Sequence, residues 1–320
     1  MTPLLQITGL STRFQLASGL LKAVECVDLT LEPGETLALV GESGCGKSIT
    51  AASIMRLVPP PGRIVSGSVL FQGIDLMKLS DEEMRGIRGN RIAMVFQDPM
   101  TSLNPVFTIG NQVAEGLRIH RGLSRDQAER EAVEILAQVG IPAPRERIGD
   151  YPHQLSGGMR QRVMIAMALA CRPELVIADE PTTALDVTIQ AQILELLDRL
   201  KTENRMGLIL ITHNLGIVAE RAHRTAIMYA GSIVESAPTD ELFRNPLHPY
   251  TRGLLASLPE FALPGEPLAT IAGSVPDLKG ELSGCPFRER CPICEDDCAG
   301  KRPEMREAGA GHLVRCLRAP

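Results

Sequence analysis

The chain has 320 residues, is 44% hydrophobic and carries a net charge of −5 at pH 7, so it can build a substantial core in one or two domains. This charge argues against nonspecific nucleic-acid binding, and the lack of Trp with only 3% aromatic residues removes stacking surfaces for single strands. No apolar run reaches the roughly 18 residues of a membrane span, and the first residues lack the pattern of a signal peptide. We therefore expect a soluble, intracellular protein whose eight cysteines are free thiols or metal ligands.

The N-terminal part of the chain reads as strands. Residues 4 to 9 and 23 to 31 alternate apolar and polar positions, as half-buried strands do. Residues 63 to 73 read as a further pair of strands with Gly67 between them. Phe14 lies upstream of the glycine-rich stretch that follows, and its position alone fits an ordinary core aromatic as well as a nucleotide contact.

The most informative stretch matches the phosphate-loop pattern G-x-x-x-x-G-K-[ST] in full. It consists of Gly41, Glu42, Ser43, Gly44, Cys45, Gly46, Lys47 and Ser48, followed by Ile49. An apolar run of strand length, 36–40, precedes it and a helical pattern follows over 49–57. Glycines let the backbone N–H groups point inward as an anion nest, and the helix N-terminus adds positive charge. Lys47 can then reach the β- and γ-phosphates, and the Ser48 hydroxyl can bind Mg²⁺.

Polar residues follow three further apolar runs of strand length. Gln97 follows 92–96, Asp179 and Glu180 end the run that starts at residue 175, and His213 follows 207–212. Ligands bind at the carboxyl ends of strands in α/β sheets. Alone, each of these residues has an ordinary structural explanation, but beside a phosphate loop Asp179 fits an Mg²⁺-binding acid and Glu180 a group that polarises water.

Between these strands the chain reads as largely helical. Residues 108 to 140 form two helical segments with a break at Arg121-Gly122. The run Leu155 to Arg162 contains Ser156, Gly157, Gly158 and Gln161 and leads into an apolar helix. A Ser-Gly-Gly helix start is a second anion site or a simple capped helix. Asp186 is predicted to cap an amphipathic helix that begins after it.

Taken together, these motifs closely resemble the ATP-binding-cassette (ABC) ATPases in order and spacing over residues 4 to 240, and the Ser-Gly-Gly-Met-Arg-Gln signature is the most discriminating part. The resemblance implies an α/β fold of the ABC-type P-loop NTPase class, with a RecA-like core, an antiparallel β-subdomain and a helical subdomain at about 98–170. A small Cys-rich C-terminal extension would follow at 241–320.

The resemblance assigns roles to matching positions. Phe14 falls where the family stacks an aromatic ring on adenine, and Glu180 matches the catalytic base. Gln97 matches a loop that contacts Mg²⁺ and faces the membrane subunits, and His213 matches a switch histidine. Asp186, in Ala184-Leu185-Asp186, matches a loop that crosses a dimer interface. Two such domains are expected to enclose two ATP molecules head to tail, each joining one phosphate loop to the partner's Ser156-Gly157-Gly158 equivalent.

A narrower resemblance begins past residue 240. The stretch 245–251, Asn-Pro-Leu-His-Pro-Tyr-Thr, resembles the C-terminal region of oligopeptide, dipeptide and nickel importer ATPases. Five cysteines follow between 285 and 316, and thiolates of that kind can hold Zn²⁺ or an iron–sulfur cluster or can simply stay reduced. The family pattern matches Cys285, Cys291, Cys298 and Cys316 as ligands of a [4Fe-4S] cluster, which leaves Cys294 as an extra thiol. Because this segment lies far from the nucleotide motifs in sequence, we expect it to have a structural or partner-docking role and no part in hydrolysis.

The resemblance implies the ATP-hydrolysing subunit of a membrane importer of peptides or related small solutes. Its expected partners are a second ATPase subunit, two transmembrane permease subunits and, indirectly, an extracytoplasmic binding protein, but no nucleic acid. It would then lie at the cytoplasmic face of the plasma or inner membrane. The alternative is a soluble ABC ATPase of DNA repair or translation, which the net charge disfavours. The transported solute is selected by other chains, so this sequence does not reveal it.

Overall fold

The computed structural model describes residues 2–183, 185–258, 269–280 and 283–319. The chain forms two compact units. The first unit combines Met1–Met77 with Ile211–Pro320, and the second unit is Lys78–Leu210. The first unit therefore contains both the phosphate loop and the Cys-rich extension, which lie at opposite ends of the sequence.

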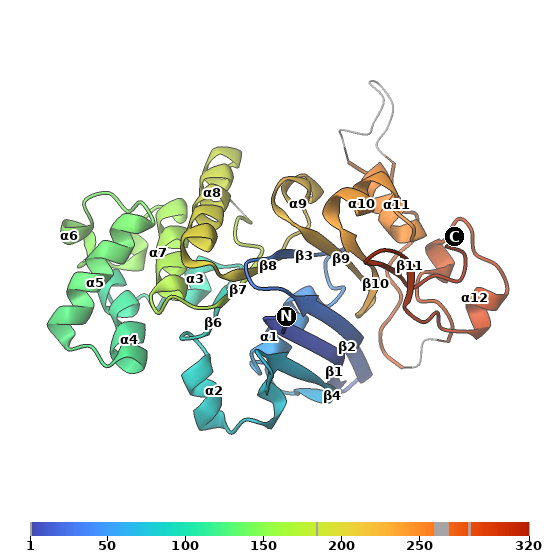
Figure 1. Cartoon of the computed structure of the whole chain (residues 1–320), viewed down its shortest axis with the longest axis horizontal. Coiled ribbons are helices and arrows are strands. Elements are labelled where there is room, and N and C mark those ends of the chain that lie inside the picture. The colour runs from blue at the N-terminus through green and yellow to red at the C-terminus, as the bar shows by residue number, and fades with distance from the viewer. Residues whose placement is uncertain (1, 184, 259–268, 281–282, 320) are drawn as a thin grey trace. The chain divides into compact units, whose positions relative to one another are not determined.

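The first unit opens with an antiparallel sheet (Figure 1). Its strands, in spatial order, are β2 (Gly19–Leu31), β1 (Leu5–Leu16), β4 (Gly62–Phe71) and β5 (Ile74–Asp75). The prediction of two strands around Gly67 is wrong, because β4 runs through that residue. Gly67 has φ +100°, and a β-carbon there would lie 2.5 Å from the Leu10 Cα. The glycine thus permits a close approach to β1, where the pairing shifts register between Thr8 and Ser11.

A second group of strands in the first unit carries the phosphate loop. Strand β3 (Thr36–Val40) is fully buried, as its apolar run predicted, and pairs in parallel with β9 (Arg224–Tyr229). Strands β10 (Ser232–Pro238), β12 (His312–Val314) and β11 (Arg306–Gly309) follow in antiparallel order. The helices of this unit are α1 (Lys47–Ile54), α9 (Leu215–Arg221), α10 (Thr239–Arg244), α11 (Pro249–Ala256) and α12 (Asp297–Gly300), with short 3₁₀ turns at Leu76–Lys78 and Arg288–Arg290.

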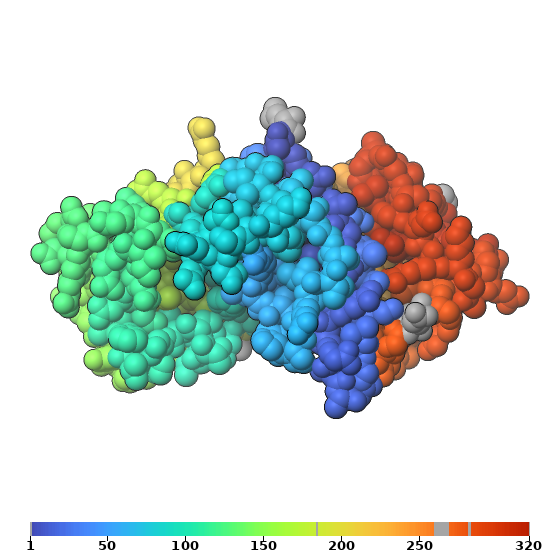
Figure 2. All heavy atoms as spheres, turned by 90° about the horizontal axis from the view of Figure 1, so that it is seen from below, coloured from blue at the N-terminus to red at the C-terminus, as the bar shows by residue number. Residues whose placement is uncertain are grey.

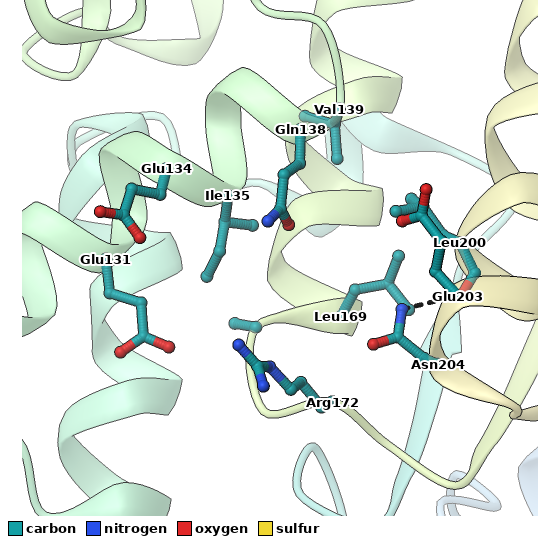
Figure 3. Close-up of a pocket in the computed structure, with 11 residues that line it drawn as sticks. Glu131, Glu134, Ile135, Gln138, Val139, Leu169, Arg172, Leu200, Glu203 and Asn204 are labelled. Atoms are coloured by element: carbon teal, nitrogen blue, oxygen red, sulfur yellow. Dashed lines mark hydrogen bonds between the residues drawn. The ribbon is translucent and has the colours of Figure 1, made fainter.

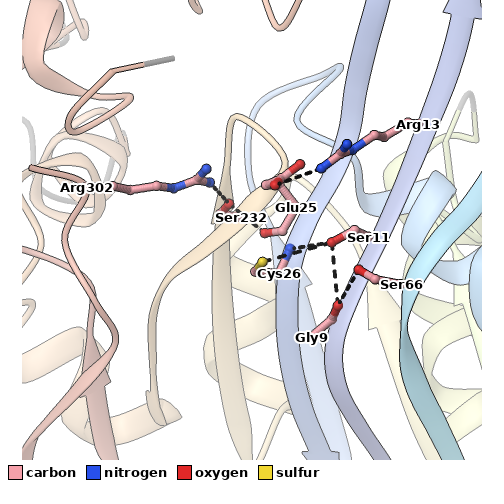
Figure 4. A network of polar contacts seen from close by, with 8 residues as sticks. All are labelled: Gly9, Ser11, Arg13, Glu25, Cys26, Ser66, Ser232 and Arg302. Carbon is pink, nitrogen blue, oxygen red and sulfur yellow. Dashed lines mark hydrogen bonds and ion pairs between the residues drawn. The ribbon is translucent and has the colours of Figure 1, made fainter. Parts of the chain in front are cut away.

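The C-terminal extension is tied to the N-terminal strands. In Figure 2 the C-terminal extension, in red, lies against the N-terminal residues, in blue. The Lys22 amide donates to the Leu278 carbonyl at 3.1 Å. Arg302 donates to the Ser232 hydroxyl at 2.8 Å, and Ser232 donates to the Glu25 carbonyl at 2.9 Å (Figure 4). The strands and the extension therefore share one network of hydrogen bonds.

The second unit contains three neighbouring strands and most of the helices. Strand β7 (Leu175–Asp179) lies between β8 (Gly207–Ile211) and β6 (Ile92–Val95), and it pairs in parallel with β6. The helices are α2 (Asp81–Ile87), α3 (Pro99–Ser102), α4 (Ile109–Arg121), α5 (Arg125–Gln138), α6 (Pro144–Arg147), α7 (Gly157–Leu169) and α8 (Val187–Asn204), with a 3₁₀ turn at Pro152–Gln154. The predicted break between two helical segments is confirmed, since α4 ends at Arg121 and its C-cap, Gly122, is in the left-handed conformation, φ 64°.

A pocket in the second unit lies away from the nucleotide motifs. Helices α5 and α8 supply acidic side chains, including Glu131, Glu134 and Glu203, and Arg172 projects into the same space (Figure 3). Asn204 donates to the Leu200 carbonyl at 2.7 Å on one wall. None of the residues that line this pocket belongs to a predicted motif.

None of the helices in the described part of the chain has the length and apolar character that a membrane span requires.

Candidate functional site

The phosphate loop forms the turn between β3 and α1. Gly46 starts the helix in the left-handed conformation, φ +110°, and a β-carbon there would lie 2.4 Å from the Ala23 carbonyl oxygen. The Lys47 ammonium donates to the carbonyls of Gly41 at 2.8 Å and Glu42 at 3.1 Å. The lysine is therefore folded back over the loop, where an anion held by the loop would meet it. Ser43, Gly44 and Ser48 are exposed, and Ile49 is half-buried.

Cys45 is buried inside the loop. Burial raises the pKa of its thiol despite the nearby Lys47. The residue therefore behaves as a small apolar side chain that fills the loop, and not as a reactive thiolate.

Distant parts of the first unit hold the loop in place. The Gly231 amide, at the tip of the β9–β10 hairpin, donates to the Cys45 carbonyl at 2.9 Å. A β-carbon at Gly41 would lie 2.2 Å from the Met228 carbonyl oxygen, so the hairpin packs directly on the loop. The Glu42 amide donates to the Tyr250 hydroxyl at 2.9 Å. These contacts fix the backbone that a phosphate would bind.

Phe14 and His213 also lie in the first unit. Phe14 is half-buried on β1, and its ring lies against Gly62 at the start of β4, 2.5 Å from an added β-carbon. His213 is exposed and directly follows Thr212, whose amide donates to the Leu39 carbonyl at 3.4 Å. The stacking role of Phe14 and the switch role of His213 remain predictions.

In the second unit, Gln97 and Glu180 meet. The Gln97 amide donates to Glu180 Oε2 at 3.1 Å, and the Thr183 hydroxyl donates to the same oxygen at 2.9 Å. Glu180 directly follows β7 and has φ 45°, a left-handed conformation that costs a non-glycine residue energy. Asp179, the last residue of β7, is buried at 5% exposure. The strand end thus presents one buried and one half-buried carboxylate.

The Ser-Gly-Gly turn caps helix α7. Ser156 is exposed and accepts from the Met159 amide at 3.3 Å, so it is the N-cap. Gly157 and Gly158 pack on the segment after Glu180, since a β-carbon on Gly158 would lie 2.8 Å from Ile189. The Gln161 side chain is 2% exposed, and its amide nitrogen has no hydrogen-bond partner among the described residues.

The loop predicted to cross a dimer interface is adjacent to this turn. Asp186 caps α8 as predicted, accepting from the Ile189 amide at 2.9 Å. Leu185 lies 3.7 Å from an added β-carbon on Gly157. Ala184 lies outside the described residues.

Four cysteines of the extension line one cavity. They are Cys285, Cys291, Cys298 and Cys316, and Cys294 is exposed outside it. Burial, aided by the charges of the other three thiols, raises the pKa of Cys285 to about 11. Within the described ranges, no group of three or more His, Cys, Asp or Glu is close enough to bind a single metal ion.

The parallel strands, the phosphate loop and the paired carboxylates after β7 define a P-loop ATPase with a separate Ser-Gly-Gly turn. Comparison with known proteins identifies its family. A family profile described as "ABC transporter" matches residues 24–183, and one described as "Oligopeptide/dipeptide transporter, C-terminal region" matches residues 234–298. The chain belongs to the ABC transporter family, and its enzymatic activity is ATP hydrolysis.

Whole-chain relatives support this assignment. The dipeptide transport ATP-binding protein DppD of Bacillus subtilis is 50% identical over 99% of this chain and 95% of that protein. DppD of Escherichia coli is 48% identical over 98% and 96%. A Brucella melitensis protein named for peptide import and ATP binding is 55% identical over 99% and 97%.

Solved structures confirm the predicted fold class. The ATP-binding cassette MJ0796, in a dimeric post-hydrolysis state bound to ADP and Pi, has a TM-score of 0.66 and 28% identity. It covers 73% of this chain and 98% of its own. CbiO1 of Clostridium perfringens, part of an ABC transporter complex, has a TM-score of 0.64 and 25% identity, with 77% and 92% covered.

The nucleotide motifs did not predict which residues outside the phosphate loop hold it in place. Gly231, Met228 and Arg290 all contact the loop but belong to no nucleotide motif. Tyr250 and Arg290 lie in stretches of the C-terminal region that the sequence had singled out, but nothing in the sequence linked them to the loop. The extension reaches the phosphate loop in space, which the sequence separation did not predict.

Proposed function

We propose that this chain hydrolyses ATP to drive the import of peptides through a membrane ABC transporter. The observation that carries the proposal is the similarity to peptide and dipeptide transport ATP-binding proteins, which extends beyond the cassette through the C-terminal region. The chain has the parts of a motor subunit, and the solute pathway would be supplied by its membrane partners.

We assign to the site residues the roles that the family resemblance implies. The phosphate-loop amides and Lys47 bind the triphosphate, and Phe14 stacks on the adenine. Ser48, Asp179 and Gln97 would supply oxygen ligands to Mg²⁺, and the ion would neutralise charge on the phosphates. His213 contacts the γ-phosphate.

Glu180 is the group that activates water. Its carboxylate accepts a proton while the water oxygen bonds to the γ-phosphorus, and the bond to the bridging oxygen breaks so that ADP leaves with the electron pair. Gln97 and Thr183 both donate to the same carboxylate oxygen, Oε2, which orients the carboxylate so that Oε1 accepts the proton of the water. The left-handed backbone of Glu180 supports this reading, because strained residues concentrate at functional sites.

Ser156, Gly157, Gly158 and Gln161, together with Asp186, act on the nucleotide held by a second ATPase subunit. Ser156 is exposed and caps a helix N-terminus, where an anion is favoured. MJ0796, to which the chain is similar, is a dimer bound to ADP and Pi.

Exposed apolar side chains support a membrane subunit as a further partner. Four of them lie close together in the sequence, at the end of β6 and around α3: Phe96, Met100, Val106 and Phe107. Met100 is 61% exposed and Val106 71% exposed. Because large apolar side chains exposed to water are typical of interaction surfaces, we place the permease contact on this segment. Such docking would keep the chain at the cytoplasmic face of the membrane.

We propose that the four cysteines that line the cavity bind a [4Fe-4S] cluster. Four thiols surround one space, and the exposed Cys294 stays outside it, which matches the ligand set implied by the family pattern. Anaerobic purification with iron, sulfide and zinc analysis tests this. About four irons and four sulfides per chain would support the cluster, and one zinc per chain would support the alternative. A preparation that contains neither iron nor zinc would contradict both.

Reconstitution tests the main proposal. The chain is copurified with its integral membrane subunits, and ATP-dependent uptake of a labelled dipeptide into liposomes is measured. Lys47→Ala should abolish uptake by weakening nucleotide binding, while the subunits still assemble. A chain that fails to associate with any integral membrane protein would contradict the proposal.

A further inference from the structure

Arg290 joins the Cys-rich extension to the phosphate loop. It lies between Cys285 and Cys291, and its guanidinium forms a bidentate ion pair with the carboxylate of Glu42, the second residue of the loop. Nη1 lies 2.7 Å from Oε2, and Nη2 lies 2.9 Å from Oε1. The Arg290 side chain is only 5% exposed, so solvent screens the pair weakly. Parallel hydrogen bonds of this kind fix orientation as well as distance.

The guanidinium has no freedom to serve another partner. Its Nε donates to the Ala272 carbonyl at 3.0 Å, Nη2 donates to the Ile271 carbonyl at 3.2 Å, and Nη1 donates to the Tyr229 hydroxyl at 3.4 Å. With the two bonds to Glu42, all five N–H groups of Arg290 are used. The arginine is thus held rigidly before any nucleotide binds.

Glu42 transmits this constraint to the lysine that binds phosphate. Its amide donates to the Tyr250 hydroxyl at 2.9 Å, and its carbonyl accepts from Lys47 at 3.1 Å and from the Cys45 amide at 3.2 Å. Arg290 therefore fixes the side chain of the same residue whose carbonyl holds the Lys47 ammonium.

Charge gives the pair a second effect. A carboxylate in a loop that binds a triphosphate repels the ligand unless a cation offsets it. Arg290 provides that cation from outside the loop, which leaves Lys47 free for the phosphates.

Aromatic packing anchors the segment that carries Arg290. Phe287, three residues before it, packs edge-on against Tyr229 with ring centroids 5.2 Å apart, and at a tilt against Tyr250 with centroids 5.4 Å apart. These rings belong to a buried cluster that includes Ala38 and Val40 on β3, the strand leading into the phosphate loop. The cysteine-bounded segment and the loop therefore share one packed core.

We propose that Arg290 is a positioning residue for ATP binding, through which the C-terminal extension sets the nucleotide affinity of the phosphate loop. This inference rests on the ATP-binding activity of the family, and neither the transported solute nor a cluster in the extension enters it. The extension then has a part in the nucleotide cycle as well as any structural or docking role.

The test is nucleotide affinity in the full-length, anaerobically purified chain. Isothermal titration with Mg²⁺ and adenylyl imidodiphosphate, which resists hydrolysis, gives the dissociation constant. Arg290→Ala should weaken binding at least about fivefold, the lower range of coupling between sites. Arg290→Lys keeps the charge but cannot form the bidentate pair, so it should give an intermediate affinity. The double variant Arg290→Ala/Glu42→Gln should bind more tightly than Arg290→Ala, because the uncompensated carboxylate is gone.

Arg315→Ala is the matched control. Arg315 also directly precedes a cavity cysteine, Cys316, but its guanidinium donates to the carbonyls of Ile233 and Pro303. We expect Arg315→Ala to lower the thermal unfolding midpoint while nucleotide affinity stays unchanged.

Three results would overturn the proposal. They are equal losses of affinity in Arg290→Ala and Arg315→Ala, no recovery in the double variant, or wild-type affinity in Arg290→Lys. The last result is decisive even if the alanine variant does not fold.

Discussion

The Ser-Gly-Gly turn of the second unit is capped by a hydrogen bond from a near neighbour in sequence, although its glycines also pack against Leu185 and Ile189. Ser156 accepts from Met159 three residues on, and the adjacent Asp186 accepts from Ile189, also three residues on. The phosphate loop of the first unit is fixed from afar. Tyr250 contacts Glu42 across 208 positions and Arg290 contacts it across 248. A local turn can form as soon as its helix forms, whereas the phosphate loop needs the whole first unit.

This difference predicts how the two regions respond to change. Substitutions in the second unit should act on chemistry or on one helix, and the rest of the molecule should tolerate them. Substitutions around the phosphate loop should weaken nucleotide binding and folding together, because the same contacts serve both.

Glu180→Gln is expected to have the largest effect. The change keeps the shape of the side chain and its contacts with Gln97 and Thr183 but removes the proton acceptor, so turnover should fall about 10²- to 10⁴-fold. ATP binding by the isolated chain should stay near wild type, because the phosphate loop is held separately. Steady-state hydrolysis in the assembled transporter and equilibrium ATP binding measure the two effects. Near-normal turnover would remove Glu180 from its role.

Two glycines of the phosphate loop test whether contacts with residues distant in sequence hold the loop in place. Gly46→Ala would place a β-carbon 2.4 Å from the Ala23 carbonyl oxygen, whereas no atom of the described residues lies within 4 Å of a β-carbon at Gly44. Both residues have positive φ, so Gly44→Ala should cost only the backbone strain of about 1–2 kcal/mol. Gly46→Ala should cost more than that and should also abolish ATP binding, because backbone atoms must move. Thermal unfolding measures the loss of stability in each variant. Equal losses would mean that strand β2 does not constrain the loop.

The same distinction explains how much could be predicted from the sequence. The runs around Lys47, Glu180 and His213 follow local rules of strand, turn and helix, so their placement on strand ends was predictable. The cap at Asp186 was predictable for the same reason. The fold class followed from the order of these motifs.

The outside support of the phosphate loop could not be predicted. Arg290 is one of 33 Lys and Arg residues, and no local pattern says which of them meets Glu42. The sequence also failed to predict that β4 is continuous. Gly67 suggested a turn, but in the structure its lack of a side chain allows β4 to approach β1 closely. Such pairings depend on tertiary packing, which overrides local preference.

A buried glutamate offers a third test. Glu235 is fully buried and accepts from the amides of Leu247 and His248 at 2.7 and 2.9 Å, and His312 Nε2 lies 2.7 Å from it. It thus joins β10, the start of α11 and β12. Glu235→Ala leaves these polar groups unpaired and should destabilise the chain by about 3 kcal/mol. Denaturant unfolding measures the loss.

Glu203, which forms an ion pair with a residue close to it in sequence, is the matched control for Glu235. It lies 3.9 Å from Arg199, four residues before it on α8, and both side chains are more than half exposed. Glu203→Ala should cost no more than about 0.5 kcal/mol, because exposed ion pairs contribute little. Similar losses for the two variants would show that long-range contacts do not dominate the first unit.

Ser156→Ala should have a small effect on stability and a separate effect on activity. Losing the cap of α7 should cost about 1 kcal/mol. Ser124→Ala is the control, because Ser124 caps α5 with the same 3.3 Å bond, from Gln127, and lies outside the nucleotide motifs. Both variants should lower the unfolding midpoint by a similar amount. If Ser156 also acts on the partner's nucleotide, only Ser156→Ala should slow hydrolysis in the assembled transporter, with nucleotide affinity of the isolated chain unchanged. Equal rates of hydrolysis in the two variants would show that Ser156 serves only as a helix cap. The proposal that the Ser-Gly-Gly turn acts on the partner's nucleotide would then be wrong.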